Sequence, residues 1–234
     1  VQTIHLTISE VNLQKMHDAL PERIYVPGTF RWGDVKLENV GIRYKGNSSS
    51  RPEQRHKRSF LIKVNEFEKG TRFLGLRRIA LDNGVQFGGL FSEPIITDIL
   101  RAEGIPASRH NYARVFINDK LIGVYGNVER IDESFVETHF PGKKGPLYKV
   151  HMPGPGATLN YAGDDVNEYK KAFEPKTNAA DKKYDELIQL FRGIELGLKT
   201  RAAAPLEQQL RMDEFLKTTA IMLFAGCFDQ LTGW

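Results

Sequence analysis

The sequence predicts an α+β protein with two lobes, a β-rich one followed by a helical one. Runs that alternate apolar and polar residues fill the first half, and helical patterns dominate after residue 180. Between them, "MPGPGATLNYAGDD" and "FEPKTNAAD" are rich in Gly, Pro, Asn and Asp, which is typical of a long loop or insertion. We therefore expect a β-rich lobe, a connection, this loop and the start of a helical lobe, at residues 1–128, 129–150, 151–180 and 181–234.

Each element has its own signal. "IHLTIS" alternates apolar and polar residues, and Ser9-Glu10 then begins a helix. "NYARVFINDKLIGVYGNVER" predicts two strands joined at Asn118-Asp119-Lys120 in a hairpin. The other expected strands cover 34–46, 58–67 and 73–83, where Leu74, Leu76 and Ile79 supply apolar positions; the other expected helices cover 90–103, 132–140, 183–196, 205–211 and 212–228.

Composition excludes several classes of protein. With 234 residues, a net charge of +4 and a pI near 9.0, the chain has a mild basic excess that fits an acidic small-molecule ligand, without the dense basic stripes of a nucleic-acid binder. Its longest apolar stretch, "TTAIMLFAGCF", has 11 residues, and a membrane span needs about 20, so a core helix is expected there. Cys227 has no intrachain disulfide partner, and the scattered histidines make no zinc pattern.

The stretch "VGIRYKGNSSS" is similar to the sequence pattern of a phosphate-binding P-loop, G-x-x-x-x-G-K-[ST]. Gly41 and Gly46 have its spacing, but Lys45 precedes the second glycine. Pro52 and the β-rich "SFLIKV" follow where a P-loop needs a helix, which argues against a P-loop NTPase. Two interpretations remain: a solvated hairpin with a basic flank, or a hairpin whose N–H and hydroxyl groups bind phosphate. In the second, charge comes from Lys45, Arg51, Arg55, Lys57 and Arg58.

Four further places could carry chemistry, and each has a plain structural alternative. Lys63 in "FLIKV" resembles the phosphate-binding lysine of the kinase strand V-A-I-K, or is a lysine on the wet face of an edge strand. Glu93 begins a helix, where an acid also stabilises the helix dipole. "VERID", residues 128–132, could present backbone groups to a purine, or simply end a strand. Asp229 follows the most apolar helix and could equally be a turn residue.

The order of these motifs resembles the CotH family, the spore-coat protein H-like kinases. "VGIRYKGNSSS", "KRSFLIKV", "FLGLRRIALDN", "ILRAEGIPASRHNYARVFINDKLIGVYGNVERID" and "GPLYKV" follow the family pattern from about residue 3 to the end. The resemblance implies an atypical protein-kinase fold, with a β-rich N-lobe over a helical C-lobe that is truncated here. It also implies transfer of the ATP γ-phosphate to Ser/Thr hydroxyls of a protein substrate, with Mg²⁺ or Mn²⁺.

The resemblance assigns roles to individual residues. Asp229 and Lys63 are expected to be catalytic, Glu93 to orient Lys63, and Glu129–Asp132 to receive adenine. The expected ATP-binding residues are Lys45, Asn47, Ser48, Ser49, Lys63, Glu93, Glu129, Ile131 and Lys149. The metal ligands are expected beyond Trp234, and none is expected among residues 1–234. An extracytoplasmic or spore-surface location follows from the resemblance alone, and the alternative function is a non-catalytic surface or coat module with a nucleotide cleft.

Overall fold

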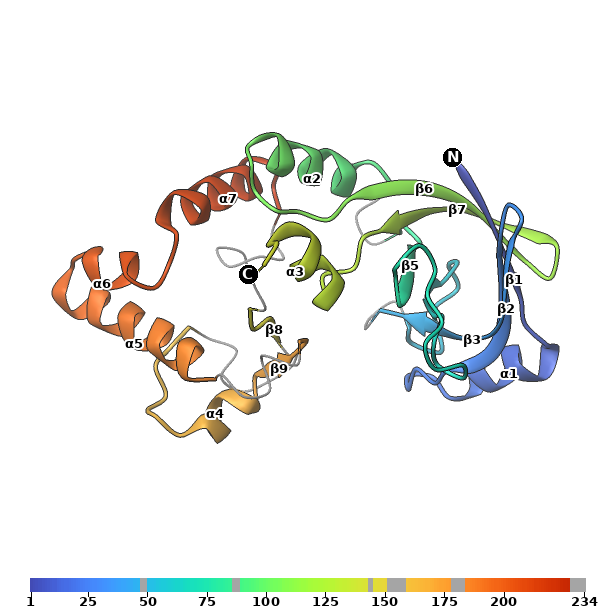
Figure 1. Cartoon of the computed structure of the whole chain (residues 1–234), viewed down its shortest axis with the longest axis horizontal. Helices are drawn as coiled ribbons and strands as arrows, with labels where there is room; N and C mark the ends of the chain where they lie inside the picture. Colours follow the sequence, from blue (N-terminus) through green and yellow to red (C-terminus); the bar gives the residue numbers. More distant parts are fainter. Residues whose placement is uncertain (47–49, 86–88, 143–144, 151–158, 178–183, 228–234) are drawn as a thin grey trace. The chain divides into compact units, whose positions relative to one another are not determined.

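The computed structural model describes residues 1–46, 50–85, 89–142, 145–150, 159–177 and 184–227. The chain forms two compact units. The first comprises residues 1–99 and 107–130, and the second comprises residues 100–106 and 131–234. Each unit is described by itself below, with the labels of Figure 1.

The first unit is a closed β-barrel, which we call the barrel unit (Figure 1). Around the barrel the strands follow the order β1-β2-β3-β4-β5-β7-β6. All neighbours are antiparallel except β1 and β6, whose parallel pairing closes the barrel. The strands are β1 (Gln2–Thr7), β2 (Val26–Trp32), β3 (Val35–Lys45), β4 (Ser59–Lys63), β5 (Arg78–Asp82), β6 (His110–Ile117) and β7 (Lys120–Val128).

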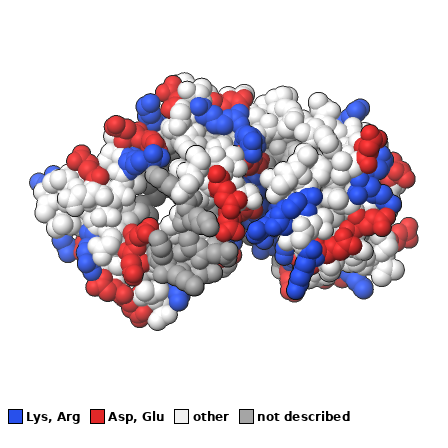
Figure 2. All heavy atoms as spheres, in the orientation of Figure 1, with Lys and Arg blue, Asp and Glu red and all other residues white. Residues whose placement is uncertain are grey.

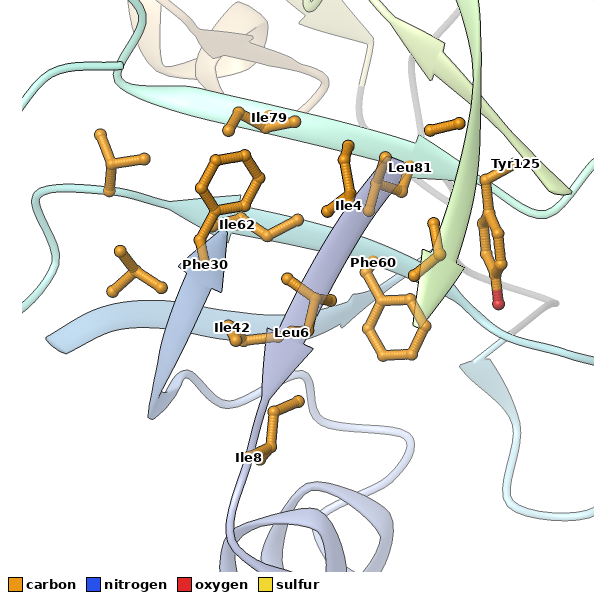
Figure 3. Packing of buried hydrophobic residues seen from close by; sticks show 14 of the residues in the cluster. Ile4, Leu6, Ile8, Phe30, Ile42, Phe60, Ile62, Ile79, Leu81 and Tyr125 are labelled. Carbon is orange, nitrogen blue, oxygen red and sulfur yellow. The ribbon is translucent and has the colours of Figure 1, made fainter. Parts of the chain in front are cut away.

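The barrel is filled by the alternate side chains of its strands. On β4, Phe60 and Ile62 belong to the buried core, as does Val64 just beyond it (Figure 3 labels the first two). Ser59, Leu61 and Lys63 therefore lie on the outer face, because successive strand residues point to opposite sides. The core also holds Ile4, Leu6, Ile8, Met16, Val26, Phe30, Val40, Ile42, Ile79, Leu81, Ala113, Val115 and Tyr125.

Local signals predicted two features of this unit correctly. Helix α1 (Glu10–Asp18) begins after Ser9, whose side chain accepts a hydrogen bond from the Asn12 N–H. The turn between β6 and β7 has left-handed φ values of 49° at Asn118 and 64° at Asp119, which confirms the hairpin. The Asn118 side chain also bonds both the N–H and the C=O of Ile8, so this turn is tied to the end of β1.

Helix α2 (Ser92–Ala102) runs from the barrel unit into the second unit. In the described part of the chain, the second unit holds five more helices and a two-stranded sheet. These elements are α3 (Glu133–His139), β8 (Tyr148–Val150), α4 (Val166–Lys170), β9 (Phe173–Pro175), α5 (Tyr184–Thr200), α6 (Ala204–Glu207) and α7 (Met212–Phe224). A small aromatic core joins α4, β9 and α5; its buried members are Tyr169, Ala172, Phe173, Tyr184, Ile188 and Phe191.

The expected protein-kinase-like fold, with a β-rich N-lobe and a helical C-lobe, is wrong. The strands close into a barrel of seven in the described part of the chain, accompanied by a few helices. The physical reason is the double pairing of β1, which bonds β2 on one side and β6 on the other. Alternation along a strand shows that one face is buried, but it carries no information about which distant strand completes the sheet.

Three smaller expectations also differ from the structure. β2 has no counterpart among the predicted elements, because Pro27 and Gly28 interrupt its pattern. The strand expected at 73–83 begins only at Arg78, and Leu74 before it has a φ of 49° and is exposed. The core helix expected at the apolar stretch corresponds to α7, in which no residue is buried.

Candidate functional site

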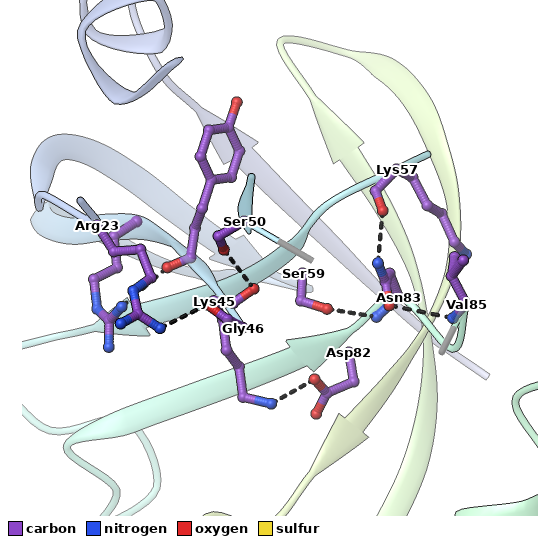
Figure 4. Close-up of polar contacts among 11 residues, drawn as sticks. Arg23, Lys45, Gly46, Ser50, Lys57, Ser59, Asp82, Asn83 and Val85 are labelled. Carbon is purple, nitrogen blue, oxygen red and sulfur yellow. Dashed lines mark hydrogen bonds and ion pairs between the residues drawn. The ribbon is translucent and has the colours of Figure 1, made fainter. Parts of the chain in front are cut away.

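The hairpin between β3 and β4 begins at a lysine on the outer face of the barrel. Lys45 pairs with Ser59 of β4, and the register of β4 with β5 places Asp82 on the far side of Ser59. The Lys45 Nζ atom reaches across β4 to lie 2.5 Å from Asp82 Oδ1 (Figure 4). Because both side chains are about one-quarter to one-third exposed (31% and 23%), an incoming anion can meet this ammonium group.

A network of hydrogen bonds holds the backbone around Asp82. The hydroxyl of Ser59 accepts from the N–H of Asn83 at 2.9 Å, and the Asn83 amide donates to the Lys57 carbonyl at 2.7 Å (Figure 4). The Val85 N–H donates to Asn83 Oδ1 at 3.2 Å. Since Ser59 and Asn83 are buried, these bonds fix the end of β5 and with it the position of the Asp82 carboxylate.

Two of the expected basic residues of the hairpin have structural roles. Arg58 is buried, and its Nη2 donates to the carbonyls of Arg51, Pro52 and Gln54 at 3.0, 3.3 and 3.2 Å. Lys57 donates to the Val124 carbonyl and lies 4.6 Å from the centre of the Tyr125 ring. Arg58 therefore stabilises the loop by satisfying its carbonyls, whereas Lys45 is the hairpin cation that faces a carboxylate.

Two further titratable groups interact with this ion pair. Desolvation by the surrounding protein raises the pKa of Glu93, the Asp82 carboxylate raises it further, and Lys45 lowers it. Burial lowers the pKa of His110, against the opposing effects of Asp82 and Asp98. We call Lys45, Asp82, Glu93 and His110 the hairpin-end cluster. It combines one lysine, two carboxyl groups and one imidazole on the same side of the barrel.

The His110 ring depends on a glycine. A Cβ atom at Gly126 would lie 2.6 Å from His110 Nε2, so the absence of a side chain makes room for the imidazole. His110 also meets the Tyr112 ring edge-on, at 5.3 Å between centroids, and the Tyr112 hydroxyl donates to the Leu90 carbonyl at 3.1 Å. These contacts tie the segment just before α2, and hence the start of the helix that carries Glu93, to β6.

Lys63 lies at the other end of the outer face. It pairs with Gly41, four residues before Lys45 on β3, which corresponds to about 13 Å along the strand. Its Nζ atom is 2.5 Å from Glu66 Oε2 and 5.7 Å from the centre of the Tyr25 ring. Glu93, the carboxyl group expected to orient Lys63, belongs to the hairpin-end cluster, and the catalytic and orienting roles of these two residues stay predictions.

The remaining predicted residues are dispersed. Asn47, Ser48, Ser49 and Asp229 lie outside the described residues. The Glu129 side chain accepts from the backbone N–H of Arg109 at 3.0 Å and from its guanidinium at 2.6 Å, and these bonds raise the pKa of Arg109. Ile131 and Lys149 belong to the second unit, where both are exposed. The roles predicted for these residues stay predictions.

Comparison with family models gives one match. The model described as CotH kinase protein matches residues 42–233, most of the chain. The chain belongs to the CotH kinase family. A search of curated proteins found no match. The resemblance inferred from the motif order is therefore confirmed, and CotH membership indicates a kinase-related or coat-related role.

The matched region includes the hairpin-end cluster of this CotH-family chain. Two of its members, Asp82 and His110, were not predicted as site residues. Asp82 ends the strand "RIALD", and a carboxylate after an apolar run was the one available signal. His110 had no such signal, because its position depends on Gly126 of a neighbouring strand.

Metal binding by this CotH-family chain stays a prediction. Among the described residues, no group of three or more His, Cys, Asp or Glu side chains is arranged to hold a metal ion. Nor does any helix in the described ranges have the length and apolarity needed to cross a membrane. The chemistry available in the hairpin-end cluster is that of a lysine that can bind an anion, next to carboxyl groups that orient it.

Proposed function

We propose that this CotH-family chain binds ATP and takes part in transfer of the γ-phosphate to a Ser/Thr hydroxyl of a protein. The observation that carries the proposal is the position of Lys45, on the outer face at the base of the Ser-rich hairpin, with its Nζ atom 2.5 Å from Asp82. Phosphoryl transfer depends mainly on positioning and on neutralisation of phosphate charge. A half-buried lysine beside a loop of small polar residues meets both needs.

Lys45 is the cation that we assign to the phosphates. The Asp82 carboxylate holds the ammonium group in place when no phosphate is bound, and a phosphate oxygen of higher charge then competes for the same donors. Glu93 lies close enough to Lys45 and Asp82 to feel both charges. Burial and the Asp82 carboxylate raise its pKa, so Glu93 takes up a proton more readily than an ordinary glutamate does.

The other roles in the proposal come from family membership. Asn47, Ser48 and Ser49 would donate hydrogen bonds to the phosphates, and Asp229 would accept the proton of the attacking hydroxyl. Mg²⁺ or Mn²⁺ would neutralise charge between the β- and γ-phosphates. Glu129 and Ile131 flank the segment that would meet adenine; because the Glu129 side chain already accepts from Arg109, we assign the backbone of this segment to that contact.

The test measures binding and transfer separately. The 234-residue chain is titrated with a fluorescent ATP analogue, with and without Mg²⁺. Transfer from γ-labelled ATP to a Ser/Thr-containing protein is measured with a chain that continues past Trp234, where the metal ligands are expected. We expect saturable binding that Lys45→Met weakens, and transfer that Asp229→Asn abolishes. Binding without transfer, unchanged by Asp229→Asn, would support the binding module instead. Absence of nucleotide binding would refute the proposal.

A further inference from the structure

A second group of charges lies on the outer face of the barrel, at the end of β4 away from the hairpin. Arg43 of β3, Lys63 of β4 and Arg78 of β5 face outward there, and the first two lie near the ring of Tyr25. We call these four residues the basic patch. On the face of the barrel unit that Figure 2 shows, basic side chains (blue) gather beside acidic ones (red).

The strand register forces the cations of the basic patch together. Lys63 is directly opposite Arg78 across the β4–β5 pair, and Arg43 is opposite Leu61, two residues from Lys63 on the same face. Directly opposite side chains are about 5 Å apart at Cβ, and like charges in that position destabilise a sheet. A fold that keeps such an arrangement gains stability when an anion binds to it.

Arg43 and Lys63, two cations of this patch, have little acidic compensation among the described residues. Glu66 contacts Lys63 at 2.5 Å, and its Oε2 atom is buried. Arg43 donates to the Tyr44 carbonyl at 3.0 Å and lies 5.1 Å from the Tyr25 ring centre; among the described residues it has no carboxylate partner. Arg43 and Lys63 thus both lie near the Tyr25 ring, and the Glu66 carboxylate contacts Lys63.

We propose that the basic patch binds an acidic segment of a partner protein. Cations on three adjacent strands match carboxylates spaced along an extended chain. The barrel is closed, so a partner strand finds no free edge here and recognition depends on side chains. The proposal rests on the proposed function only where it identifies the partner as the protein substrate, which would then carry acidic residues near its Ser/Thr.

Within the patch, Lys63 is well separated from the cation assigned to phosphate. Lys63 lies about 13 Å along the sheet from Lys45, with Leu61 between the two charged ends. Leu61 is buried although it lies on the outer face. On β4 this apolar side chain separates Lys63 from the hairpin end, whereas Arg43 lies two residues from Lys45 on the same face of β3, about 7 Å away along the strand. Substitutions at Lys63 can therefore be read without direct disturbance of the hairpin-end cluster.

The experiment measures binding of fluorescein-labelled ten-residue peptides to the 234-residue protein by anisotropy at 0.15 M salt. One peptide carries a serine flanked by Asp and Glu, and its control replaces each acid by Asn or Gln. We expect the acidic peptide to bind with marked salt dependence and the neutral one at least about tenfold more weakly. Arg43→Gln and Lys63→Gln each weaken the acidic peptide about five- to tenfold.

A substitution that removes a negative charge next to the patch should have the opposite effect on acidic-peptide binding. Glu66→Gln removes the acidic neighbour of Lys63 with little change in shape, so we expect acidic-peptide binding to tighten about two- to threefold. Lys36→Gln is the matched control, since Lys36 lies on β3 outside the patch and pairs with Glu38; it leaves binding unchanged. Thermal melting of each variant verifies that it is folded.

The outcomes separate this proposal from the proposed function. Equal binding of both peptides, or Arg43→Gln binding the acidic peptide like the wild type, would overturn the basic patch. So would a tenfold loss of ATP-analogue affinity in Lys63→Gln, because the patch would then belong to the nucleotide site. Acidic-peptide binding by a chain that binds no ATP analogue would refute the proposed function alone and leave the patch as a binding surface.

Discussion

The two lysines on the outer face of the barrel give a sharp test, because the structure separates them. Replacing Lys45 by Met removes the ammonium group at the base of the hairpin and keeps much of the side-chain volume. A hydrogen bond to a charged group contributes about 1.5–3 kcal/mol, so loss of one phosphate contact should weaken ATP-analogue binding about 10- to 150-fold. Lys45→Arg, which keeps the charge, should retain most of the affinity.

Replacing Lys63 by Met should have a much smaller effect. At about 13 Å in water, two unit charges interact by about 0.3 kcal/mol before salt screening. At 0.15 M salt the screening length is about 8 Å, which lowers this energy further. We therefore expect Lys63→Met to change ATP-analogue affinity by about twofold or less, even though its sequence context "FLIKV" resembles the kinase strand.

The assay is a fluorescence titration of wild type, Lys45→Met, Lys45→Arg and Lys63→Met at fixed salt. Thermal melts run beside it, because Lys45→Met leaves the Asp82 carboxylate without its lysine and Lys63→Met does the same to Glu66. Similar losses of stability in the two Met variants would show that an affinity difference is not a folding effect. A tenfold loss in Lys63→Met with none in Lys45→Met would refute the reasoning.

Three further predictions concern stability. Arg58→Lys loses the planar donor group that binds three loop carbonyls, so its free energy of unfolding should fall by about 2 kcal/mol in urea titration, while Arg55→Lys, on the exposed loop, should be neutral. Gly126→Ala forces a Cβ against the His110 ring and should cost about 1–3 kcal/mol; an unchanged melting temperature would contradict this geometry. The pKa of Glu93 is raised in the fold above its ordinary 4.5, so the stability it contributes is fully present below pH 4.5 and is lost as the pH rises through the raised pKa. Glu93→Gln should therefore melt at or above the wild-type temperature at pH 7 and match it near pH 4, and a lower melting temperature at pH 7 would count against the assignment.

The elements that the sequence predicts well are those with local signals. Ser9 begins α1 because its side chain bonds an orphan N–H of the first turn, and Asn118-Asp119 makes a hairpin because both residues adopt left-handed φ. β2 lacks such a signal, since Pro27 and Gly28 break its alternation. Closure of the barrel is the hardest feature to predict, because it depends on β1 pairing with β6, more than 100 residues further along the chain.

In the candidate site too, residues with a local sequence signal were predicted, and residues brought near by strand pairing were not. Lys45 was predicted because it stands inside a recognisable glycine and serine motif, whereas Asp82, its partner, is brought near only by the pairing of β4 with β5. The sequence resemblance paired Glu93 with Lys63, yet Glu93 lies in the field of Lys45 and Asp82. The roles of Lys63 and Glu93 stay predictions, and the proximity of Glu93 to Lys45 and Asp82 could not be predicted without the fold.

Strand register also gives the two charged ends of the outer face their different chemistry. At the hairpin end, Lys45 meets carboxyl groups whose charges depend on one another, so a bound phosphate changes the balance of the whole group. Further along the face, Arg43 and Lys63 both lie near the Tyr25 ring, and Glu66 contacts Lys63, which leaves a net positive field. A cluster that responds to its ligand suits nucleotide binding, and a fixed field suits steering of an acidic partner. If both proposals hold, one face of the barrel binds the phosphate donor and an acidic partner at positions two to four residues apart on β3.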